Sequence, residues 1–352
     1  MESKKTINDA VDWYSGKRPV YEQLSKKVES IIQEIISDEK IHIHTISCRT
    51  KEIDSFKKKI EDSKYTDPIS QITNYSGVRI ITYVESDLES VCKVIEAHFE
   101  IDKENSIDKS QSLGVDKVGY KSIHYICKLP SDRRKLPEYK KFNDMCFEIQ
   151  VRTILQHGWA EIEHDKDYKF SGELPLHLKR RFKVLAGVLE LADREFNEIA
   201  REIDEYSASV RSNTEKGNLD TLIDSTSIKQ YLSLKFADLI KYGLGTDFGS
   251  EDGEKEVLAE MRAFGVNTLQ DLDDIIPKDL TKKMIEASET TNYLGLLRSI
   301  MMIVDIKKYF NQCWQNNWSV ISKSSREVLT SYNIPIDEYV DELGSVPEFW
   351  LS

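Results

Sequence analysis

The sequence predicts an α+β fold, in which helices flank a short mixed sheet and an all-helical domain follows it. Apolar residues recur every three or four positions through residues 5–38 and 175–206, which is typical of long helices. The run GVRIITYV at residues 77–84 is rich in β-branched residues, which indicates a buried strand. Beyond residue 228 only helical periodicity is found. The 352 residues are enough for about two domains.

The first half of the predicted sheet domain begins with the helix over residues 5–38. The alternating segment IHIHTIS at residues 41–47 predicts a strand. A lysine-rich helix is expected over residues 52–62, before the buried strand at residues 77–84. An amphipathic helix is then predicted over residues 86–98.

Two further strands are predicted over residues 120–129 and 145–153, each followed by polar or helical segments. Helices are expected over residues 154–168 and 175–206. Together these elements give a mixed sheet of about four or five strands with helices packed on it.

The polar stretch SNTEKGNLDTLIDSTS marks a change in composition and predicts a linker over residues 212–227. We therefore expect domains over residues 1–211 and 228–352. The second domain is predicted as a small helical bundle without a recognisable chemical motif. Its aromatic segments at residues 313–318 and 347–351 suit either core packing, a lid, or an interface with another copy or a protein partner.

Charge and composition exclude several classes of protein. The chain has 49 Lys and Arg against 61 Asp and Glu, a net charge of −12, which argues against broad nucleic-acid binding but allows a local basic pocket. No apolar run is long enough to span a membrane, and residues 1–10 lack an apolar signal core. The five cysteines form no CxxC pair, so a cytoplasmic location is expected.

Cationic residues gather where the first strand gives way to a helix. Arg49, Lys51 and Lys59, with Ser55 between them, surround this junction. Clustered cations beside a helix N-terminus suit polyphosphate. The alternative is a solvated, lysine-rich helix face.

Polar residues also interrupt the predicted strands. Arg79 lies in an otherwise apolar strand that Asn74 and Gly77 precede, and a charge there needs a partner, a ligand or access to solvent. Tyr120 and His124 share one face of the next strand, where an aromatic ring can stack on a base; the alternative is a wet strand face.

Three polar residues alternate on a single strand, namely Glu148, Gln150 and Arg152. Alternate residues of a strand lie on the same face, so these side chains are expected to form one wall of a site. A strand with one solvated face is the alternative.

At these residues the sequence resembles the RelA/SpoT synthetase family, which makes the alarmones guanosine tetra- and pentaphosphate. The matching segments are RTKEIDSFKKK, NYSGVRIITY, GYKSIHY and EIQVRTILQHGWAEIEHDKDYK, in the family's order. The resemblance covers about residues 5–205 and is greatest to stand-alone synthetases. It implies a nucleotidyltransferase-like sheet and transfer of pyrophosphate from ATP to the 3′-hydroxyl of GDP or GTP.

The resemblance also implies roles for individual residues. Arg49, Lys51, Ser55 and Lys59 would bind ATP, with Arg79 close to its phosphates. Tyr120, Lys121, His124, Gln150 and Arg152 would form the acceptor-nucleotide site. Glu148 would bind Mg²⁺ or orient the 3′-hydroxyl, and Asn74 would be the second metal ligand.

Asn74 departs from the family pattern, which has Asp five residues before Arg79. An amide oxygen can still bind Mg²⁺, but it carries no charge and accepts no proton. Either the synthetase is weak or inactive, another carboxylate has taken over the role, or the Asp was replaced deliberately. Lys121 stands where Arg is usual, which keeps the charge but not bidentate geometry.

Two other functions therefore stay open beside alarmone synthesis. One is a toxin-like pyrophosphokinase that acts on tRNA or adenine nucleotides, although the acidic net charge does not favour tRNA. The other is a nucleotide-binding sensor without catalysis, which Asn74 favours.

Overall fold

The computed structural model describes residues 2–62, 65–108, 122–169, 175–314, 321–336 and 339. The chain divides into two compact units, Met1–Arg201 and Glu202–Ser352. Helix α8 (Leu176–Glu215) passes through this division. The expected linker at residues 212–227 thus includes the end of one helix, and the predicted domain boundaries stay a prediction.

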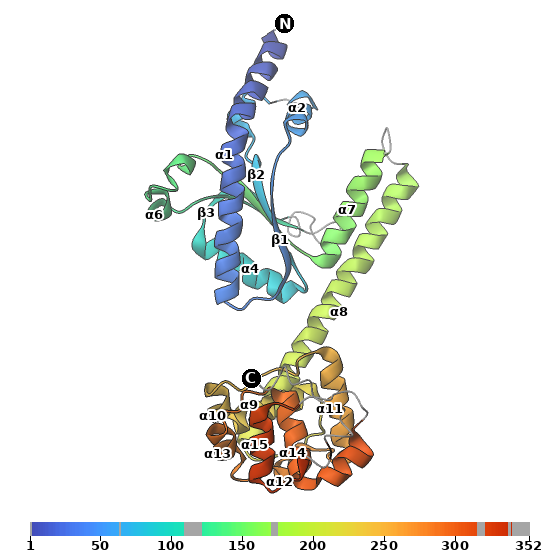
Figure 1. Cartoon of the computed structure of the whole chain (residues 1–352). Helices are drawn as coiled ribbons and strands as arrows, with labels where there is room; N and C mark the ends of the chain where they lie inside the picture. The colour runs from blue at the N-terminus through green and yellow to red at the C-terminus, as the bar shows by residue number, and fades with distance from the viewer. Residues whose placement is uncertain are drawn as a thin grey trace. The chain divides into compact units, whose positions relative to one another are not determined.

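The first unit is built on a five-stranded mixed sheet, which confirms the predicted fold class. Its strands follow the order β1-β2-β5-β4-β3 (Figure 1). Only β2 and β5 run parallel; the other neighbours are antiparallel. The strands are β1 (Ile43–Thr50), β2 (Ser76–Thr82), β3 (Glu100–Asp108), β4 (Ile123–Lys128) and β5 (Phe147–Thr153).

The helices of this unit follow the predicted order. The long ones are α1 (Glu2–Asp38), α2 (Ile53–Asp62), α4 (Glu85–His98), α7 (Ile154–Lys169) and the first part of α8. Short helical turns are α3 (Pro68–Gln71), α6 (Ser131–Arg134) and the 3₁₀ turn Lys140–Phe142. Figure 1 shows α1 running along the sheet, with α2 beside its N-terminal half.

One face of the sheet is apolar because strand residues alternate between the two faces. Val78 and Ile80 of β2 and Ile149 and Val151 of β5 are almost fully buried. They belong to one core cluster with apolar residues of α1 and α4. The opposite face of β2 and β5 therefore carries the polar residues that alternate with these apolar ones.

The prediction from the sequence misplaced one strand and missed another. The predicted strand at residues 41–47 is found at Ile43–Thr50, so it continues to the cationic segment. Strand β3 was not predicted, because its sequence EIDKENSID lacks apolar alternation. In β3 the register against β4 shifts between Asp102 and Ile107, where the Asp102 carboxylate accepts backbone N–H groups from Glu104 and Asn105. Pairing with β4, rather than propensity, accounts for this edge strand.

An aromatic cluster joins α1, α2 and the segment before β2. Tyr75 is 1% exposed, and its ring lies 4.9–5.6 Å from the rings of Trp13, Tyr14, Tyr21 and Phe56. Phe56 also packs on Tyr14, with ring centroids 4.6 Å apart. The cluster fixes α2 against the sheet, and with it Lys59.

Replacing Phe56 by Ala should destabilise the first unit by about 3–5 kcal/mol, because it leaves a cavity in this cluster. Urea unfolding followed by ¹⁹F NMR of fluorotryptophan at Trp13 measures that unit directly. Replacement of the half-exposed Tyr83 by Ala is the matched control and should cost less than about 1 kcal/mol. Equal losses in both variants would contradict a stabilising role for the cluster.

The second unit is helical within its described residues, as predicted. Its α-helices are α9 (Ser225–Lys235), α10 (Ala237–Lys241), α11 (Glu251–Phe264), α12 (Leu269–Ile275), α13 (Leu280–Glu286), α14 (Tyr293–Lys308) and α15 (Lys323–Ser331), and a π-helical turn over Tyr309–Cys313 follows α14. The predicted single helix at residues 228–242 is broken at Phe236, whose backbone is not helical. A separate apolar core with Leu232, Leu296 and Ile300 at 0% exposure holds this unit together.

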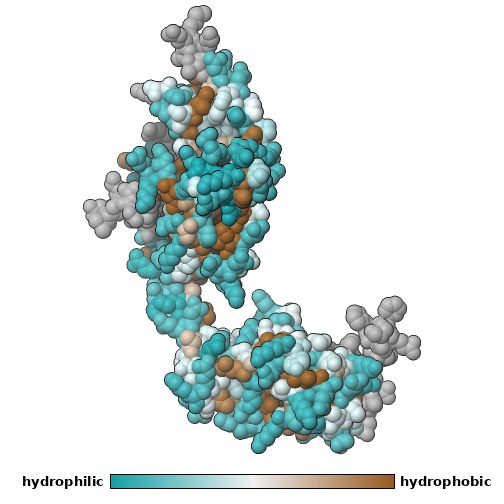
Figure 2. Space-filling view, turned by 90° about the vertical axis from the view of Figure 1, so that its left-hand side faces the viewer, coloured by the Kyte–Doolittle hydropathy of each residue, from teal (hydrophilic) through white to brown (hydrophobic). Residues whose placement is uncertain are grey.

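The surface is mixed in character. On the face shown in Figure 2, hydrophilic residues cover most of each unit and hydrophobic residues form smaller patches. Among the described helices, none combines the length and the apolar character needed to cross a membrane.

Candidate functional site

The polar face of the central strands brings most of the predicted site residues together. Arg49 of β1 is the register partner of Gly77 of β2, and Gly77 is the partner of Glu148 of β5. Register partners lie on the same face of a sheet, so these three positions form one row. Gly77 has no side chain to separate Arg49 from Glu148; a Cβ there would lie 3.4 Å from the Glu148 carbonyl oxygen.

A second row of side chains lies on the same face, two residues further along β2 and β5. Arg79 is the register partner of Gln150, and Gln150 is the partner of His124 on β4. The Arg79 guanidinium donates a hydrogen bond of 3.0 Å to Glu161 of α7. Arg79 therefore has a partner within the unit, and this partner ties α7 to the sheet.

Glu148 is the centre of a hydrogen-bonded chain. Its Oε1 lies 2.8 Å from Nδ1 of His124, and its Oε2 accepts a 2.9 Å hydrogen bond from Gln150. Gln150 in turn accepts one of 2.8 Å from Arg152. The three β5 residues of this chain are each at most 7% exposed. The alternative of a solvated strand face is therefore wrong for Glu148, Gln150 and Arg152.

Glu148 is held in its ionised form. Burial opposes ionisation, but the hydrogen bonds from His124 and Gln150 and the charge of Arg49 outweigh it, so the pKa of Glu148 lies below its ordinary value. A carboxylate of low pKa is a weak proton acceptor at neutral pH but a good ligand for cations.

Cations crowd the end of the site at β1 and α2. Burial first, and then the charges of Lys59 and Arg49, lower the pKa of Lys51 to about 8, while Glu148 acts in the opposite direction. The four charged groups are thus near enough to influence one another. An anionic ligand between them would relieve the repulsion among the three cations.

The backbone of Lys51 is fixed by residues that the sequence analysis did not single out. Its carbonyl oxygen accepts hydrogen bonds from Tyr14 at 2.5 Å and Arg18 at 3.3 Å, and its N–H donates to the Tyr75 carbonyl. Tyr14 and Arg18 are four residues apart on α1, so they lie on one helix face. The spacing can be read from the sequence and shows that the two side chains share a helix face. It does not show which strand that face contacts.

Asn74 lies at the same end, because its Oδ1 accepts a 3.1 Å hydrogen bond from Lys59. Ser55 is exposed on α2 and has no hydrogen bond to another predicted site residue in the described structure. Tyr120 and Lys121 lie outside the described residues. Within the residues that are described, no three His, Cys, Asp or Glu side chains are arranged to hold a metal ion.

A cavity of about 830 Å³ opens beside β3 and β4. His124 lines it, together with Ser106, Ile107 and Lys103. Nδ1 of His124 faces Glu148, while its buried Nε2 has no hydrogen-bond partner among the described residues. The imidazole therefore joins the carboxylate to a cavity large enough for an organic ligand.

Titration of Lys51 should make anion binding depend on pH. Binding of a polyphosphate favours the protonated amine, so affinity falls as pH rises through about 8. We compare the dissociation constant for tripolyphosphate of the unaltered chain with that of Lys51→Arg, and expect the ratio of the two to rise by about tenfold per pH unit above pH 8. Calorimetric titrations between about pH 7 and pH 9.5 measure this ratio. Protonation of tripolyphosphate itself affects both proteins equally and therefore cancels in the ratio. A flat ratio would show that Lys51 does not contact the anion.

Residues 48–173 match the model of a family described as "Region found in RelA / SpoT proteins", which confirms the resemblance over this segment. GTP pyrophosphokinase YwaC of Bacillus subtilis (strain 168) is 32% identical over 133 residues, which are 38% of this chain and 60% of YwaC. The match thus spans less than two thirds of YwaC. GTP pyrophosphokinase YjbM of the same organism is 28% identical over 151 residues, 43% of this chain and 67% of YjbM.

Solved structures give similar matches. Small alarmone synthetase 1 from Bacillus subtilis is 25% identical with a TM-score of 0.47, covering 55% of this chain and 98% of that one. Small alarmone synthetase 2 from Bacillus subtilis is 27% identical with a TM-score of 0.46, covering 54% and 99% of the two chains.

Proposed function

We propose, from the match of residues 48–173 to the region found in RelA / SpoT proteins, that this chain transfers pyrophosphate from ATP to the 3′-hydroxyl of GDP or GTP. The product would be the alarmone (p)ppGpp. The names of both relatives, each a GTP pyrophosphokinase, support the proposal. The observation that carries it is the row formed by Arg49, Gly77 and Glu148 across the sheet, with Lys51 next along the chain from β1 and Lys59 bonded to Asn74.

The cations supply the donor half of the site. The amines of Lys51 and Lys59 and the guanidinium of Arg49 would bind the ATP phosphates, because phosphoryl-transfer chemistry depends on charge neutralisation and positioning. Ser55, on the exposed side of α2, would assist by hydrogen bonding. Arg79 would have to exchange its bond with Glu161 for a phosphate in order to take part.

The acceptor half lies around His124 and its cavity. The buried Nε2 of His124 would hydrogen-bond the acceptor nucleotide, and Glu148 would orient the 3′-hydroxyl. Gln150 and Arg152 hold Glu148 in place through their chain of hydrogen bonds. Tyr120 would stack on the base, with Lys121 beside it, as the family resemblance implies.

Mg²⁺ fits this site only as an ion shared with the nucleotide. Glu148 is the single acidic group in the hydrogen-bonded chain, and the amide oxygen of Asn74 already accepts a bond from Lys59. Protein Mg²⁺ sites that use one carboxylate rely on substrate phosphates for further ligands. Glu148, with Asn74, would hold the ion against ATP, and the ion would neutralise the phosphate charge.

A transfer assay tests this function. The full chain is incubated with γ-labelled ATP and Mg²⁺, and with GDP, GTP, no further acceptor or bulk tRNA in separate reactions. Label on a guanosine nucleotide supports the proposal, and its loss in Lys51→Met ties the activity to the cationic cluster. Label on tRNA or an adenine nucleotide alone would show the toxin-like reaction instead.

Asn74 favours a second candidate, a nucleotide-binding sensor without catalysis, because it removes the expected metal carboxylate. A sensor would bind ATP by calorimetry but give no labelled product with any acceptor. ATP and GTP are cytoplasmic substrates, so we expect the protein there. An oligomer or a protein partner of the second unit stays a prediction.

A further inference from the structure

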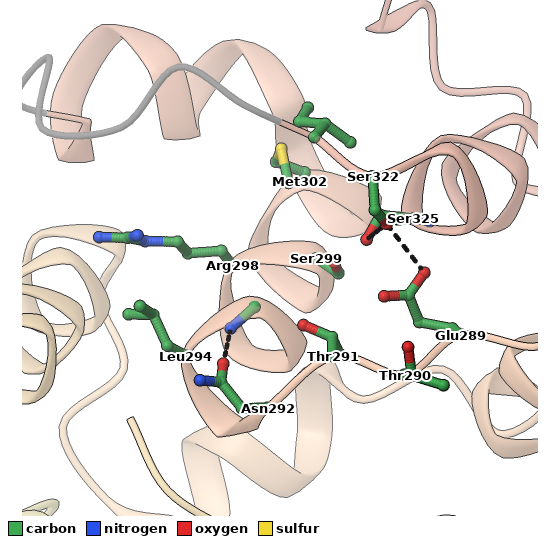
Figure 3. A pocket seen from close by; sticks show the side chains of 12 residues that line it. Glu289, Thr290, Thr291, Asn292, Leu294, Arg298, Ser299, Met302, Ser322 and Ser325 are labelled. Carbon is green, nitrogen blue, oxygen red and sulfur yellow. Dashed lines mark hydrogen bonds between the residues drawn. The ribbon is translucent and has the colours of Figure 1, made fainter. Parts of the chain in front are cut away.

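The second unit contains a pocket of about 420 Å³ that the proposed reaction does not use. It lies where the N-terminal halves of α14 and α15 approach the segment after α13 (Figure 3). All its lining residues belong to this unit, from Glu289 to Met302 and from Ile321 to Ser325. The volume is in the range of small-molecule sites.

A buried carboxylate, Glu289, forms part of the pocket wall. The residue is 8% exposed, and its side chain points toward Ser322 and Ser325 (Figure 3). The preceding residue, Ser288, has a left-handed backbone with φ 52°, and the Glu289 N–H donates to the Met284 carbonyl at 2.9 Å. The end of α13 therefore fixes the direction in which the carboxylate points.

Within the described part of the chain, Glu289 has no countercharge, because no Lys, Arg or His there pairs with it. The hydrogen bond that its side chain accepts from the Ser322 hydroxyl is long, at 3.4 Å. Arg298, the cation that also lines the pocket, is occupied by Glu260 through bonds of 2.7 and 2.9 Å. Burial of an unpaired carboxylate is unfavourable unless something compensates its charge.

Other polar groups share the pocket with this carboxylate. Ser322 is the N-cap of α15, so the positive end of that helix dipole lies beside Glu289. The hydroxyl groups of Thr290, Thr291 and Ser299 also border the pocket (Figure 3). Thr291 lies so close to Gly295 that a Cβ at that glycine would be 2.0 Å from its Oγ1, which keeps Thr291 at the wall.

Part of the pocket lining is apolar. Leu294, Met302 and Ile321 contribute to it, and Met302 is 3% exposed. A ligand that matches both the carboxylate and the apolar lining has a cationic group and a hydrocarbon part. An ammonium or guanidinium group would pair with Glu289 in a charge-assisted hydrogen bond.

We propose that this pocket binds a protonated amine or guanidine on an apolar stem, with Glu289 as the anionic anchor. The same chemistry is presented by a free small amine and by a lysine or arginine side chain of a protein partner. The site is independent of the proposed transfer reaction, since none of its residues lies in the first unit.

Methyl NMR of the full chain, with ¹³C-methyl methionine, tests the proposal through the Met302 resonance, assigned with Met302→Leu. Titrations use n-butylamine, n-butylguanidine and neutral n-butanol. We expect saturable shifts with a cationic probe and about tenfold weaker binding of butanol. N-acetyl-lysine amide distinguishes a lysine side chain of a protein from a free amine. If it binds with the affinity of butylamine, the site is assigned to a protein side chain; if it does not bind, the site is assigned to a free amine.

Glu289→Gln should weaken butylamine binding by about tenfold or more, whereas Glu286→Gln, on the exposed end of α13, should leave it unchanged. We also expect no fall in Tm for Glu289→Gln, because a buried unpaired charge does not stabilise the fold. The proposal would be overturned if Glu289→Gln bound butylamine as tightly as the unaltered chain, or if butanol bound as tightly as butylamine. Absence of binding for both butylamine and butylguanidine would also overturn it. A large fall in Tm would do the same, since it would show a structural role.

Discussion

Replacing Glu148 by Gln should reduce pyrophosphate transfer by about 10³-fold while the fold is retained. Gln has the same shape, so the buried position between His124 and Gln150 stays filled. It removes the only negative charge of the hydrogen-bonded chain, and with it the group proposed to hold Mg²⁺ and to orient the acceptor hydroxyl. Initial rates with labelled ATP and a saturating guanosine nucleotide measure the effect.

The control for this variant is Glu104→Gln, which changes an exposed carboxylate on β3 by the same substitution. It should transfer pyrophosphate at the rate of the unaltered chain. If Glu148→Gln kept the rate of the unaltered chain, Glu148 would have no part in the transfer reaction. Loss of tripolyphosphate binding in the same variant would instead indicate a disrupted cationic cluster.

Replacing Asn74 by Asp should raise the transfer rate by about 10²–10³-fold. Asn74 already directs an oxygen to within 3.1 Å of the Lys59 amine, so a carboxylate can occupy the same place without a change in shape. It would add a second anionic ligand for Mg²⁺ and a partner for Lys59. The same transfer assay detects the gain.

Asn143→Asp, an exposed substitution after the 3₁₀ turn, controls for the added charge and should leave the rate unchanged. Equal rates for the unaltered chain and Asn74→Asp would show that Glu148 alone suffices for the metal. A chain that binds ATP but transfers nothing in either form would support the sensor.

The sequence predicted the central elements well because their patterns are strong. The apolar run of β2 and the helical periodicity of α1 lead to the observed elements within a few residues. Edge strand β3 could not be predicted, since its polar residues resemble a loop until β4 pairs with them. The end of α8 was placed too early, at residue 206, because the helix continues into the polar segment before Glu215.

The sequence predicted which polar residues share a strand face but not the bonds between them across strands. Alternation along one strand correctly placed Glu148, Gln150 and Arg152 on one face. The bond between His124 and Glu148 depends on the pairing of β4 with β5, which no local pattern encodes. The bond between Arg79 and Glu161 likewise joins residues far apart in the sequence.

The parallel pairing of β2 with β5 also has a consequence for synthesis of the chain. Gly77 and Glu148 are neighbours in the sheet, although a long segment that includes α4, β3 and β4 separates them in sequence. Closing so long a loop is slow compared with forming local helices. A nascent chain that ends before β5 holds Arg49, Lys51 and Lys59 but no Glu148, so its cationic cluster lacks the carboxylate. The proposed site is therefore complete only when β5 inserts between β2 and β4, two strands that are already made.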